Sequence, residues 1–454
     1  MTRGGAVNYE HLEVSLNVGF LRSLRVEYVG KRLVALDLDP KRKLWSNATV
    51  ATIAEVFCKA FDYSVNDTTK DYELAKRDGV IHVPRYYNDT ERNMTVFPSS
   101  EPVPVLEPFH QAHRPLRLGI GTPGLLDTLA FNNETNAAYH LHADSLEVEP
   151  KAFGLNFRDV LIAMGQIDGG YMGFECSGIV TRAGENAIGQ GFKTGDRVAV
   201  LLRGHYSNLV RLHWTSAVHI PDDMNYETAA TLPMSYSTAY FALYEMARIR
   251  KNESFLIHAA TGGFGQAAIV LAKRVNAEIF VTVGREKKRD FVIKKYGIQS
   301  DHVFSSRDTS FAQGLLAVTQ GKGVDVVLNT LAGPLLQESF DCVAQFGRFI
   351  EVGKRDLQLN NSLEMGAFTR TVSFSSIDLL QLEEYRGHDV HRVLKDVVNL
   401  WKEGGISPVE PITVYPLAEI DKTFRLMQAG KHVGKIVLSV KGDDIVPVIE
   451  IYIR

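Results

Sequence analysis

Residues 261–268 read Thr-Gly-Gly-Phe-Gly-Gln-Ala-Ala, and they follow directly on the apolar run Phe-Leu-Ile-His-Ala-Ala at residues 255–260. The spacing from Gly263 to Ala268 satisfies G-x-G-x-x-G/A. A buried strand, a glycine turn and an apolar helix in this order are typical of a site where backbone amides at the helix start bind the pyrophosphate of a dinucleotide. The alternative is an ordinary turn between a strand and a helix.

Each small residue has a predicted role in this turn. Gly263 is expected to permit a tight turn, and Gly265 is expected to let the backbone approach the pyrophosphate. Ala268 is expected to let the helix and the strand pack closely. The residues predicted to bind the cofactor here are Thr261, Gly262, Gly263, Phe264, Gly265 and Gln266.

Further short apolar runs alternate with helical stretches after this turn. The runs at residues 255–260, 279–284 and 324–329 are nearly continuously apolar, which indicates strands covered on both faces. The pattern predicts an α/β fold with a doubly wound parallel sheet, a Rossmann cofactor domain over residues 234–384. The expected strands are FLIHAA (255–260), IFVTVG (279–284), HVF (302–304), VDVVLN (324–329), RFIEVG (348–353) and VSFSSI (372–377).

The second expected strand ends in Gly-Arg-Glu-Lys-Lys-Arg at residues 284–289. A site that prefers NAD carries a carboxylate near this position for the ribose 2′-hydroxyl, whereas here cations predominate. A 2′-phosphate with about two negative charges is the group that such a cluster favours. The sequence therefore predicts NADPH as the cofactor. The alternative is a solvated helix start with flexible Lys and Arg side chains.

The rest of the chain divides into further regions. Residues 114–233 have short strands and many Gly, which predicts a β-rich domain, and residues 385–440 are expected to return to it. Residues 1–110 predict a small α/β fragment without a phosphate-binding glycine loop of its own. Residues 441–454 are interpreted as a linker toward a further domain.

Composition excludes several classes of protein. The chain has 454 residues, 45% hydrophobic and 23% charged, as expected for a folded globular protein. A net charge of -3 provides no attraction toward nucleic acid. The sequence has no apolar run long enough to span a bilayer and no secretory signal core, so we expect a cytoplasmic protein with no membrane partner. Its three separated cysteines cannot form a four-cysteine metal site.

A series of sequence blocks continues from residue 114 to residue 440. They are Leu155-Asn-Phe-Arg-Asp159, Gly173-Phe-Glu-Cys-Ser-Gly178, Gly195-Asp-Arg-Val198, Leu232-Pro-Met-Ser-Tyr-Ser-Thr-Ala239, His258-Ala-Ala-Thr-Gly-Gly-Phe-Gly265, Ser305-Ser-Arg-Asp308, Val324-Asp-Val-Val-Leu-Asn329, Gly347-Arg-Phe-Ile-Glu-Val-Gly-Lys354 and Gly430-Lys-His-Val-Gly-Lys435. With these blocks the sequence resembles the enoyl reductase domain of fatty acid and polyketide synthases, within the zinc-free medium-chain dehydrogenase/reductase group. Residues 1–110 resemble, more loosely, the non-catalytic ketoreductase-like region that precedes this domain in highly reducing fungal-type polyketide synthases.

The resemblance implies a GroES-like fold for the β-rich substrate domain and NADPH-dependent reduction of an α,β-unsaturated thioester. The substrate would be tethered through phosphopantetheine to an acyl carrier protein, and the chain would be a fragment with neighbouring synthase domains. Related synthases dimerise through this domain, so a homodimer is expected. Zinc-dependent relatives carry a His where this sequence has Phe174, so no metal is predicted.

The same resemblance assigns site residues. Lys354, after the fifth expected strand, matches the lysine proposed as proton donor, and Asp378, after the sixth, matches its acidic partner. The alternatives are a surface lysine and an aspartate that only caps a helix. The further assignments are Asn156 and Thr238 near the nicotinamide ribose and carboxamide, Asn329 on the loop after the fourth strand, and Lys288 and Arg307 near the 2′-phosphate.

Each further assignment has an alternative. Asn156 or Thr238 would satisfy turn backbone, Asn329 would cap a strand end, and Arg307 would pair with Asp308. His258 is expected to be a hydrogen-bonded core histidine. The pair at residues 431–432 either borders the cofactor or forms a solvated hairpin tip.

Two other functions remain open at this point. A zinc-free quinone or alkenal oxidoreductase shares the glycine loop but normally lacks a leader such as residues 1–110. An inactive reductase-like scaffold would be expected to have a broken glycine loop or to lack Lys354, and this sequence has neither change.

Overall fold

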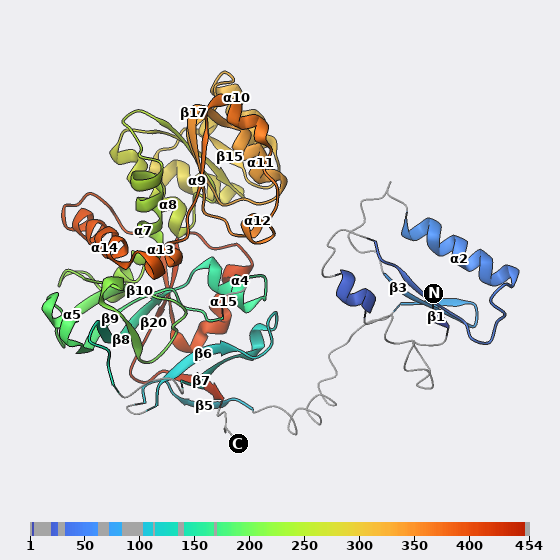
Figure 1. Cartoon of the computed structure of the whole chain (residues 1–454), viewed down its shortest axis with the longest axis horizontal. Coiled ribbons are helices and arrows are strands. Elements are labelled where there is room, and N and C mark those ends of the chain that lie inside the picture. Colours follow the sequence, from blue (N-terminus) through green and yellow to red (C-terminus); the bar gives the residue numbers. More distant parts are fainter. Residues whose placement is uncertain are drawn as a thin grey trace. The chain divides into compact units, whose positions relative to one another are not determined.

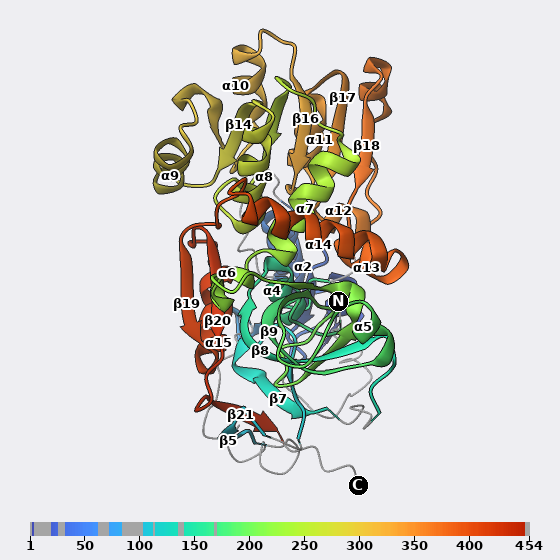
Figure 2. The same ribbon diagram turned by 90° about the vertical axis from the view of Figure 1, so that its left-hand side faces the viewer.

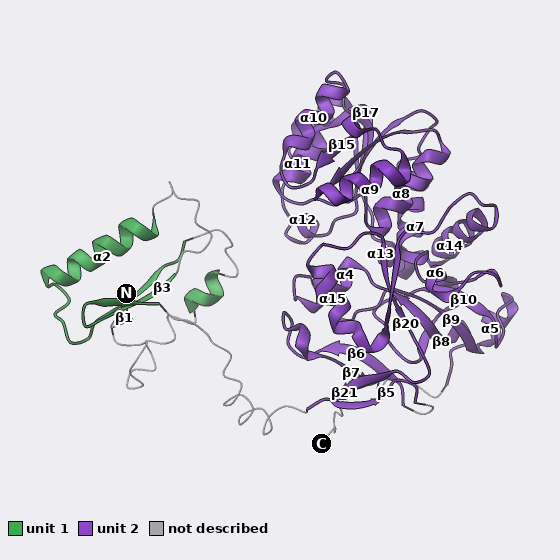
Figure 3. Cartoon of the chain, turned by 180° about the vertical axis from the view of Figure 1, so that it is seen from behind, with its two compact units in different colours: residues 1–101 green, residues 102–454 purple. Residues whose placement is uncertain are grey.

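The computed structural model describes residues 2–3, 20–25, 32–61, 72–83, 103–111, 114–134, 140–167 and 170–449. The chain divides into two compact units, residues 1–101 and residues 102–454 (Figure 3). Parts of the expected N-terminal region and residues 450–454 lie outside the described residues.

The first unit contains a four-stranded sheet in the order β1-β2-β3-β4. Helix α2 (Asn47–Ala60) begins after Ser46, whose hydroxyl accepts a hydrogen bond from the amide of Thr49. Leu36 and Val56 form the centre of a small apolar core between the sheet and this helix. The strands are β1 (Thr2–Arg3), β2 (Ala35–Leu38), β3 (Glu73–Arg77) and β4 (Val80–His82).

A six-stranded parallel sheet forms the centre of the cofactor domain in the second unit. Its order, β15-β14-β13-β16-β17-β18, is the doubly wound order of a Rossmann fold. The predicted fold class is therefore confirmed. The strands are β13 (Ser254–Ile257), β14 (Glu278–Val283), β15 (Val303–Ser305), β16 (Val324–Asn329), β17 (Val343–Glu351) and β18 (Ser373–Ser376).

The two faces of this sheet pack against different helices. Phe255 and Ile257 of β13 lie in the core that contains α7, α8, α9 and α14, whereas Leu256 between them lies in the core that contains α10 and α11. Alternate side chains of a strand point to opposite faces, so both sides of the sheet are covered. The helices are α7 (Pro233–Tyr240), α8 (Gly263–Arg274), α9 (Glu286–Tyr296), α10 (Ser310–Val318), α11 (Pro334–Asp341) and α14 (Gly387–Lys402).

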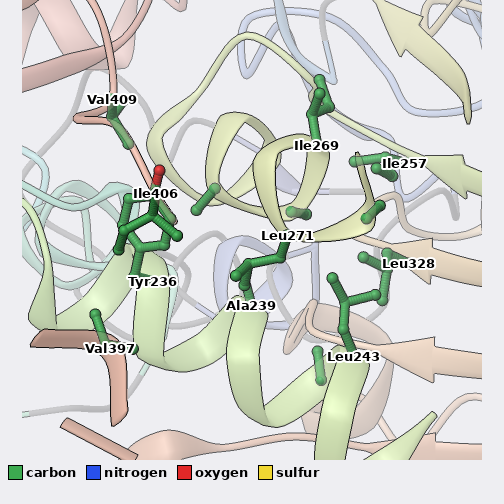
Figure 4. Packing of buried hydrophobic residues seen from close by; sticks show 14 of the residues in the cluster. Tyr236, Ala239, Leu243, Ile257, Ile269, Leu271, Leu328, Val397, Ile406 and Val409 are labelled. Carbon is green, nitrogen blue, oxygen red and sulfur yellow. The ribbon is translucent and has the colours of Figure 1, made fainter. Parts of the chain in front are cut away.

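Helix α7 connects the two domains of the second unit. Its residues Tyr236, Ala239 and Leu243, the last just beyond the helix, pack in the same core as Leu271 of α8 (Figure 4). Helix α14 adds Val397 to this core, and its apolar stripe packs against α7. His391 of α14 is also hydrogen-bonded through Nδ1 to the carbonyl of Ala217 at 3.0 Å, so this helix contacts the β-rich domain as well.

The β-rich domain is built on a seven-stranded sheet, in the order β12-β10-β9-β8-β20-β19 with β11 paired to β8. Strand β20 pairs antiparallel with β8, so the chain does return to this domain after the cofactor domain. Figures 1 and 2 show α7, α13 and α14 between this domain and the parallel sheet. The strands are β8 (Ser145–Gly154), β9 (Glu175–Ala183), β10 (Arg197–Leu201), β11 (Val210–His213), β12 (Ala217–His219), β19 (Ile412–Pro416) and β20 (Lys435–Ser439).

The residues after β20 form a strand instead of the expected linker. Within residues 441–454, β21 (Ile445–Ile449) pairs antiparallel with β5 (Val105–Pro108). The alternating side chains Val446 and Val448 are fully buried. The linker interpretation is wrong for the described residues because this alternation makes one face of the segment part of the core. Strand β5 also belongs to the second unit, although the sequence suggests a boundary near residue 110.

Short helices complete the second unit, together with two further strands of the sheet β5-β21-β7-β6. Among the described residues, no helix is both long and apolar enough to cross a membrane. The remaining elements are β6 (Leu116–Ile120), β7 (Leu129–Asn133), α4 (Phe157–Ala163), α5 (Glu185–Gly189), α6 (Tyr226–Ala229), α12 (Arg355–Gln358), α13 (Leu379–Tyr385) and α15 (Ile420–Gln428).

The glycine turn depends on close packing at Gly265. A Cβ atom at this position would lie 2.5 Å from the carbonyl oxygen of Ala259 and 2.6 Å from the Cα of Ala260. Both contacts are to backbone, which cannot move aside as a flexible side chain can. Gly265 thus lets α8 lie close to the turn after β13, in addition to the close packing that the sequence predicts at Ala268.

We predict that Gly265→Ala destabilises the protein by about 1–3 kcal/mol, because overpacking displaces the backbone of the preceding turn. Gly262→Ala is the matched control, since the nearest atom to its Cβ would be 3.5 Å away. Urea unfolding monitored by circular dichroism measures both variants. Equal unfolding midpoints for the two variants would contradict the packing role of Gly265.

Candidate active site

The first turn of α8 places three backbone amides before the helical hydrogen-bond ladder. Its hydrogen-bond ladder begins with the amide of Gln266, which donates to the carbonyl of Gly262 at 3.0 Å. The amides of Gly263, Phe264 and Gly265 therefore precede the ladder, as the first amides of any helix do. Such amides and the positive end of the helix dipole fit a pyrophosphate, which supports the predicted dinucleotide site.

Two residues of the predicted phosphate loop, Thr261 and Gln266, make hydrogen bonds within the protein. The side-chain amide of Gln266 donates to the carbonyls of Thr261 at 2.9 Å and Glu410 at 2.7 Å, and its oxygen accepts from the hydroxyl of Tyr296 at 2.6 Å. Gln266 is fully buried, and Thr261 is nearly so. The Gln266 side chain thus holds the loop in place through bonds within the protein, and Thr261 contributes its backbone carbonyl.

A basic cluster follows strands β14 and β15. The guanidinium of Arg307 donates to the carbonyl of Gly284 at 2.9 Å, and Lys288 donates to the carbonyl of Gly430 at 3.2 Å. Burial lowers the pKa of Lys288, and the positive charges of Arg285 and Arg307 lower it further. These cations therefore lie close together, and no carboxylate neutralises them among the ion pairs of the described residues. The alternative pairing of Arg307 with Asp308 is not formed, because Asp308 accepts hydrogen bonds from Ser305 and Ser310.

The loop before β20 connects the phosphate loop to this basic cluster. The amide of Gly434 donates to the carbonyl of Thr261 at 2.8 Å, and Gly430 accepts from Lys288. His432, between them, is partly buried, and its Nδ1 has no hydrogen-bond partner within the described chain. Burial lowers its pKa to about 4, with the positive charges of Lys288 and Lys435 adding to the effect. His432 is thus not part of a solvated tip, whereas Lys431 is exposed.

Lys354 and Asp378 meet at the carboxyl edge of the parallel sheet. Lys354 follows β17 and Asp378 follows β18, and these strands are neighbours. The Lys354 Nζ lies 3.4 Å from Asp378 Oδ2 and also donates to the carbonyl of Ile377. Asp378 Oδ1 accepts from the amide of Leu380 at 3.0 Å and so caps α13. The aspartate therefore caps a helix and pairs with the lysine at the same time.

Burial governs the electrostatics of Lys354. Desolvation lowers its pKa, the negative charges of Asp378 and Glu351 oppose this shift, and the positive charge of Arg158 adds to it. The lysine is one-fifth exposed. An ammonium group that releases its proton more readily than an ordinary lysine, at the open edge of the sheet, is suited to act as a general acid.

Asn329 does not reach outward from its strand. It is fully buried, and its amide donates to Glu351 Oε2 at 2.6 Å and to the carbonyl of Leu331 at 2.8 Å. Burial raises the pKa of Glu351 to about 7, and this carboxyl also accepts from the amide of Gly353 at 2.6 Å. The pair therefore shapes the turn that carries Lys354. The expectation that Asn329 contacts the cofactor is replaced by this supporting role.

Asn156 belongs to a buried cluster that the sequence does not reveal. Lys435 Nζ lies 2.5 Å from Glu175 Oε1 and donates to Asn156 Oδ1 at 2.7 Å, and the Asn156 amide donates to Glu175 at 2.9 Å. Only 4% of the Lys435 side chain and none of Glu175 is exposed. The second Glu175 oxygen accepts from the amide of Met234 at 2.8 Å. The cluster thus joins the β-rich domain to α7.

This cluster also lies beside the phosphate loop. A Cβ at Gly263 would meet Ser235 Oγ at 2.6 Å and Lys435 Cδ at 3.2 Å. Glu175 and Lys435 both stand in recognised sequence blocks, but only their three-dimensional pairing indicates their role. Thr238 lies one turn after Ser235 on α7 and is buried.

His258 is a buried core residue, as the sequence suggests. Its ring nitrogens are hydrogen-bonded to Thr282 at 2.8 Å and Ser339 at 2.9 Å. Burial lowers its pKa to about 3. A neutral, fully bonded imidazole inside the sheet cannot act on a substrate.

The position that holds a zinc ligand in zinc-dependent relatives is apolar here. Phe174 is buried, and the guanidinium of Arg158 lies 5.3 Å from the centre of its ring. Within the described ranges, no group of three His, Cys, Asp or Glu side chains is placed to bind a metal ion. The expectation that the reaction needs no metal remains a prediction.

Comparison with known proteins agrees with this architecture. Residues 142–222 match the family described as alcohol dehydrogenase GroES-like domain, and residues 298–438 match the family described as zinc-binding dehydrogenase. The crystal structure of the CurK enoyl reductase is 33% identical, covers 72% of this chain and 99% of its own, and has a TM-score of 0.64. The chain belongs to the enoyl reductase family of polyketide synthases. This family lies within the medium-chain dehydrogenase/reductase superfamily, as the resemblance implies.

Two further proteins are similar to this chain. The squalestatin tetraketide synthase of Phoma sp. (strain C2932) is 50% identical over 449 residues, which are 99% of this chain. The chain spans 17% of the length of that synthase. The quinone oxidoreductase of Escherichia coli, crystallised with NADPH, is 24% identical, covers 71% of this chain and 99% of its own with a TM-score of 0.62, and shares the fold.

We predict that Lys435→Met destabilises this enoyl reductase by about 3–5 kcal/mol, because it leaves the Glu175 carboxylate buried without its partner. The double variant Lys435→Met with Glu175→Gln should recover part of this loss. Lys422→Met is the control, since Lys422 and Glu419 form an exposed pair that contributes little. Urea unfolding measures all of them, and equal midpoints for the two single lysine variants would contradict the prediction.

Proposed function

We propose that the protein is an NADPH-dependent enoyl reductase that acts on α,β-unsaturated thioesters during polyketide chain elongation. The observation that carries this proposal is the pair formed by Lys354 and Asp378 at the carboxyl edge of the Rossmann sheet, where ligands of such sheets bind. Family membership supports the reaction type, and the N-terminal amides of α8 support the cofactor class.

The cofactor would be held by two features of the chain. The amides of Gly263, Phe264 and Gly265 would bind the pyrophosphate, and Lys288 and Arg307 would bind the 2′-phosphate. Thr238 and Asn156 would border the nicotinamide end. Bound NADPH supplies the hydride that is added to the β-carbon of the substrate.

Lys354 would complete the reaction at the α-carbon. Hydride addition leaves an enolate on the thioester, and the Lys354 ammonium would stabilise this negative charge and then donate its proton. Asp378 would orient the ammonium through their 3.4 Å contact. Glu351 and Asn329 would hold the turn that carries Lys354.

The proposed partners follow from the length of the relatives. Because the chain spans 17% of the squalestatin tetraketide synthase, we propose that it works beside other domains of such a synthase. The substrate would arrive on the phosphopantetheine arm of an acyl carrier protein. A homodimer joined through the cofactor domain is part of the same proposal.

We predict that Lys354→Ala lowers kcat for a crotonyl thioester of pantetheine by about 10²–10⁴-fold, because the general acid is lost. NADPH affinity should remain nearly unchanged, since Lys354 is not expected to contact the phosphates. Absorbance at the NADPH band and cofactor titration by fluorescence measure the two quantities.

Lys322→Ala is the control, because Lys322 is exposed in the same domain and has no place in the site. Wild-type turnover by Lys354→Ala would remove Lys354 from the mechanism. Faster reduction of a free quinone than of the thioester by the unaltered protein would favour a quinone oxidoreductase.

We predict that the double variant Lys288→Ala with Arg307→Ala binds NADPH at least about tenfold more weakly, because two charged contacts to the 2′-phosphate are lost. Affinity for NADH should change little, since that cofactor lacks the phosphate. Fluorescence titration of both cofactors measures the ratio. A preference of the unaltered protein for NADH would contradict the assignment of the basic cluster.

A further inference from the structure

Arg158 extends from the β-rich domain toward the predicted proton donor. It lies on α4, in the first turn after Asn156, and its Nη1 is 3.5 Å from Asp378 Oδ2. The Lys354 Nζ is 3.4 Å from the same oxygen. One carboxylate oxygen is thus shared by two cations from different domains.

The side chain of Arg158 has few polar neighbours besides Asp378 in the part of the chain that the structure describes. Asp378 is the one acidic residue within ion-pair distance of Arg158 in the described chain, and the guanidinium otherwise packs on the ring of Phe174. The Arg158 Nε is buried and has no hydrogen-bond partner among the described residues. About a quarter of the side chain is exposed. Arg158 is therefore held by Asp378 and by Phe174, and not by a network of its own.

Arg158 and Lys354 compete for the same negative charge. The charged groups around Lys354 are Asp378 and Glu351, which favour its protonated form, and Arg158, which disfavours it. The burial of Lys354 disfavours that form as well. Without Arg158, Lys354 would be the one cation paired with Asp378. The charge of Arg158 therefore affects the protonation of Lys354.

We propose that Arg158 is a positioning residue, which holds the Asp378 carboxylate from the β-rich domain and so shares that carboxylate with Lys354. This inference rests on the proposed function, in which Lys354 is the proton donor. Arg158 lies on α4 of the β-rich domain, whereas Asp378 follows β18 of the cofactor domain. The contact between the two domains therefore acts on the proton donor Lys354 through Asp378.

The test measures the protonation of Lys354 directly in the full chain without substrate. Trace acetylation with acetic anhydride at a series of pH values, followed by peptide mass spectrometry, reports the pKa of the Lys354 amine. Arg158→Gln should raise this pKa by about one unit, since a nearby cation is removed. Asp378→Asn should shift it in the opposite direction, because an anion is removed. Arg158→Lys should keep it near the value of the unaltered protein.

Arg203→Gln is the matched control. Arg203 also joins the β-rich domain to the segment after β18, through Glu384 at 2.8 Å and Glu383 at 3.6 Å, but it does not contact Asp378. It should leave the Lys354 pKa unchanged. If Arg158→Gln fails to fold, as judged by circular dichroism, Arg158→Met replaces it with the same expected shift.

Kinetics provide the second readout. In the wild type, kcat should fall at high pH as Lys354 loses its proton. In Arg158→Gln this fall should occur about one pH unit higher, because Lys354 keeps its proton to a higher pH. The KM for NADPH should not change. If the Lys354 pKa is the same in Arg158→Gln as in the unaltered protein, the proposed role of Arg158 is wrong. This conclusion holds even if the unaltered protein reduces the crotonyl thioester. Absence of that reduction in the unaltered protein would instead contradict the proposed function.

Discussion

The buried ion pair between Lys435 and Glu175 is the interaction on which the arrangement of the second unit depends. A lysine with 4% of its side chain exposed and a fully buried glutamate would each be costly alone, so each requires the other. Their shared contacts with Asn156 and Met234 connect β20, β9, α4 and α7. The pair lies beside Gly263, and the amide of Gly434 donates to the carbonyl of Thr261, so the segment before β20 and the phosphate loop are held against each other.

The carboxyl edge of the parallel sheet is organised by a second set of charges. Lys354, Asp378 and Arg158 come from three separate segments, and the first two are neighbours only because β17 and β18 pair in the sheet. Burial lowers the pKa of Lys354, and the negative charge of Asp378 partly opposes this shift. This balance is suited to a group that must carry a proton and then give it to carbon. The zinc-ligand position of related enzymes is occupied by Phe174, and the Arg158 guanidinium lies over its ring.

Much of the fold could be predicted because its signals are local. Apolar runs of β-branched residues predicted the strands of the Rossmann sheet, and the glycine turn predicted the start of α8. The strand at Ile445–Ile449 was missed because a short segment with alternating valines also fits an extended linker until its partner strand is known. The structural role of the Gln266 side chain was missed for a related reason: its partners Tyr296 and Glu410 are brought to it by packing, and not by the adjacent sequence.

The sequence by itself determined the class of this protein, because glycine spacing, strand periodicity and the order of the blocks are properties of the chain read in one dimension. Beyond the pair of Lys354 and Asp378, which the resemblance implies, only the tertiary structure decided which charged residues meet. Lys435 and Glu175 are separated by most of the cofactor domain along the chain, and so are Arg158 and Asp378, yet each pair is in contact. The physical reason is that the energy of a charge depends on its burial and on its partner's distance, and folding sets both.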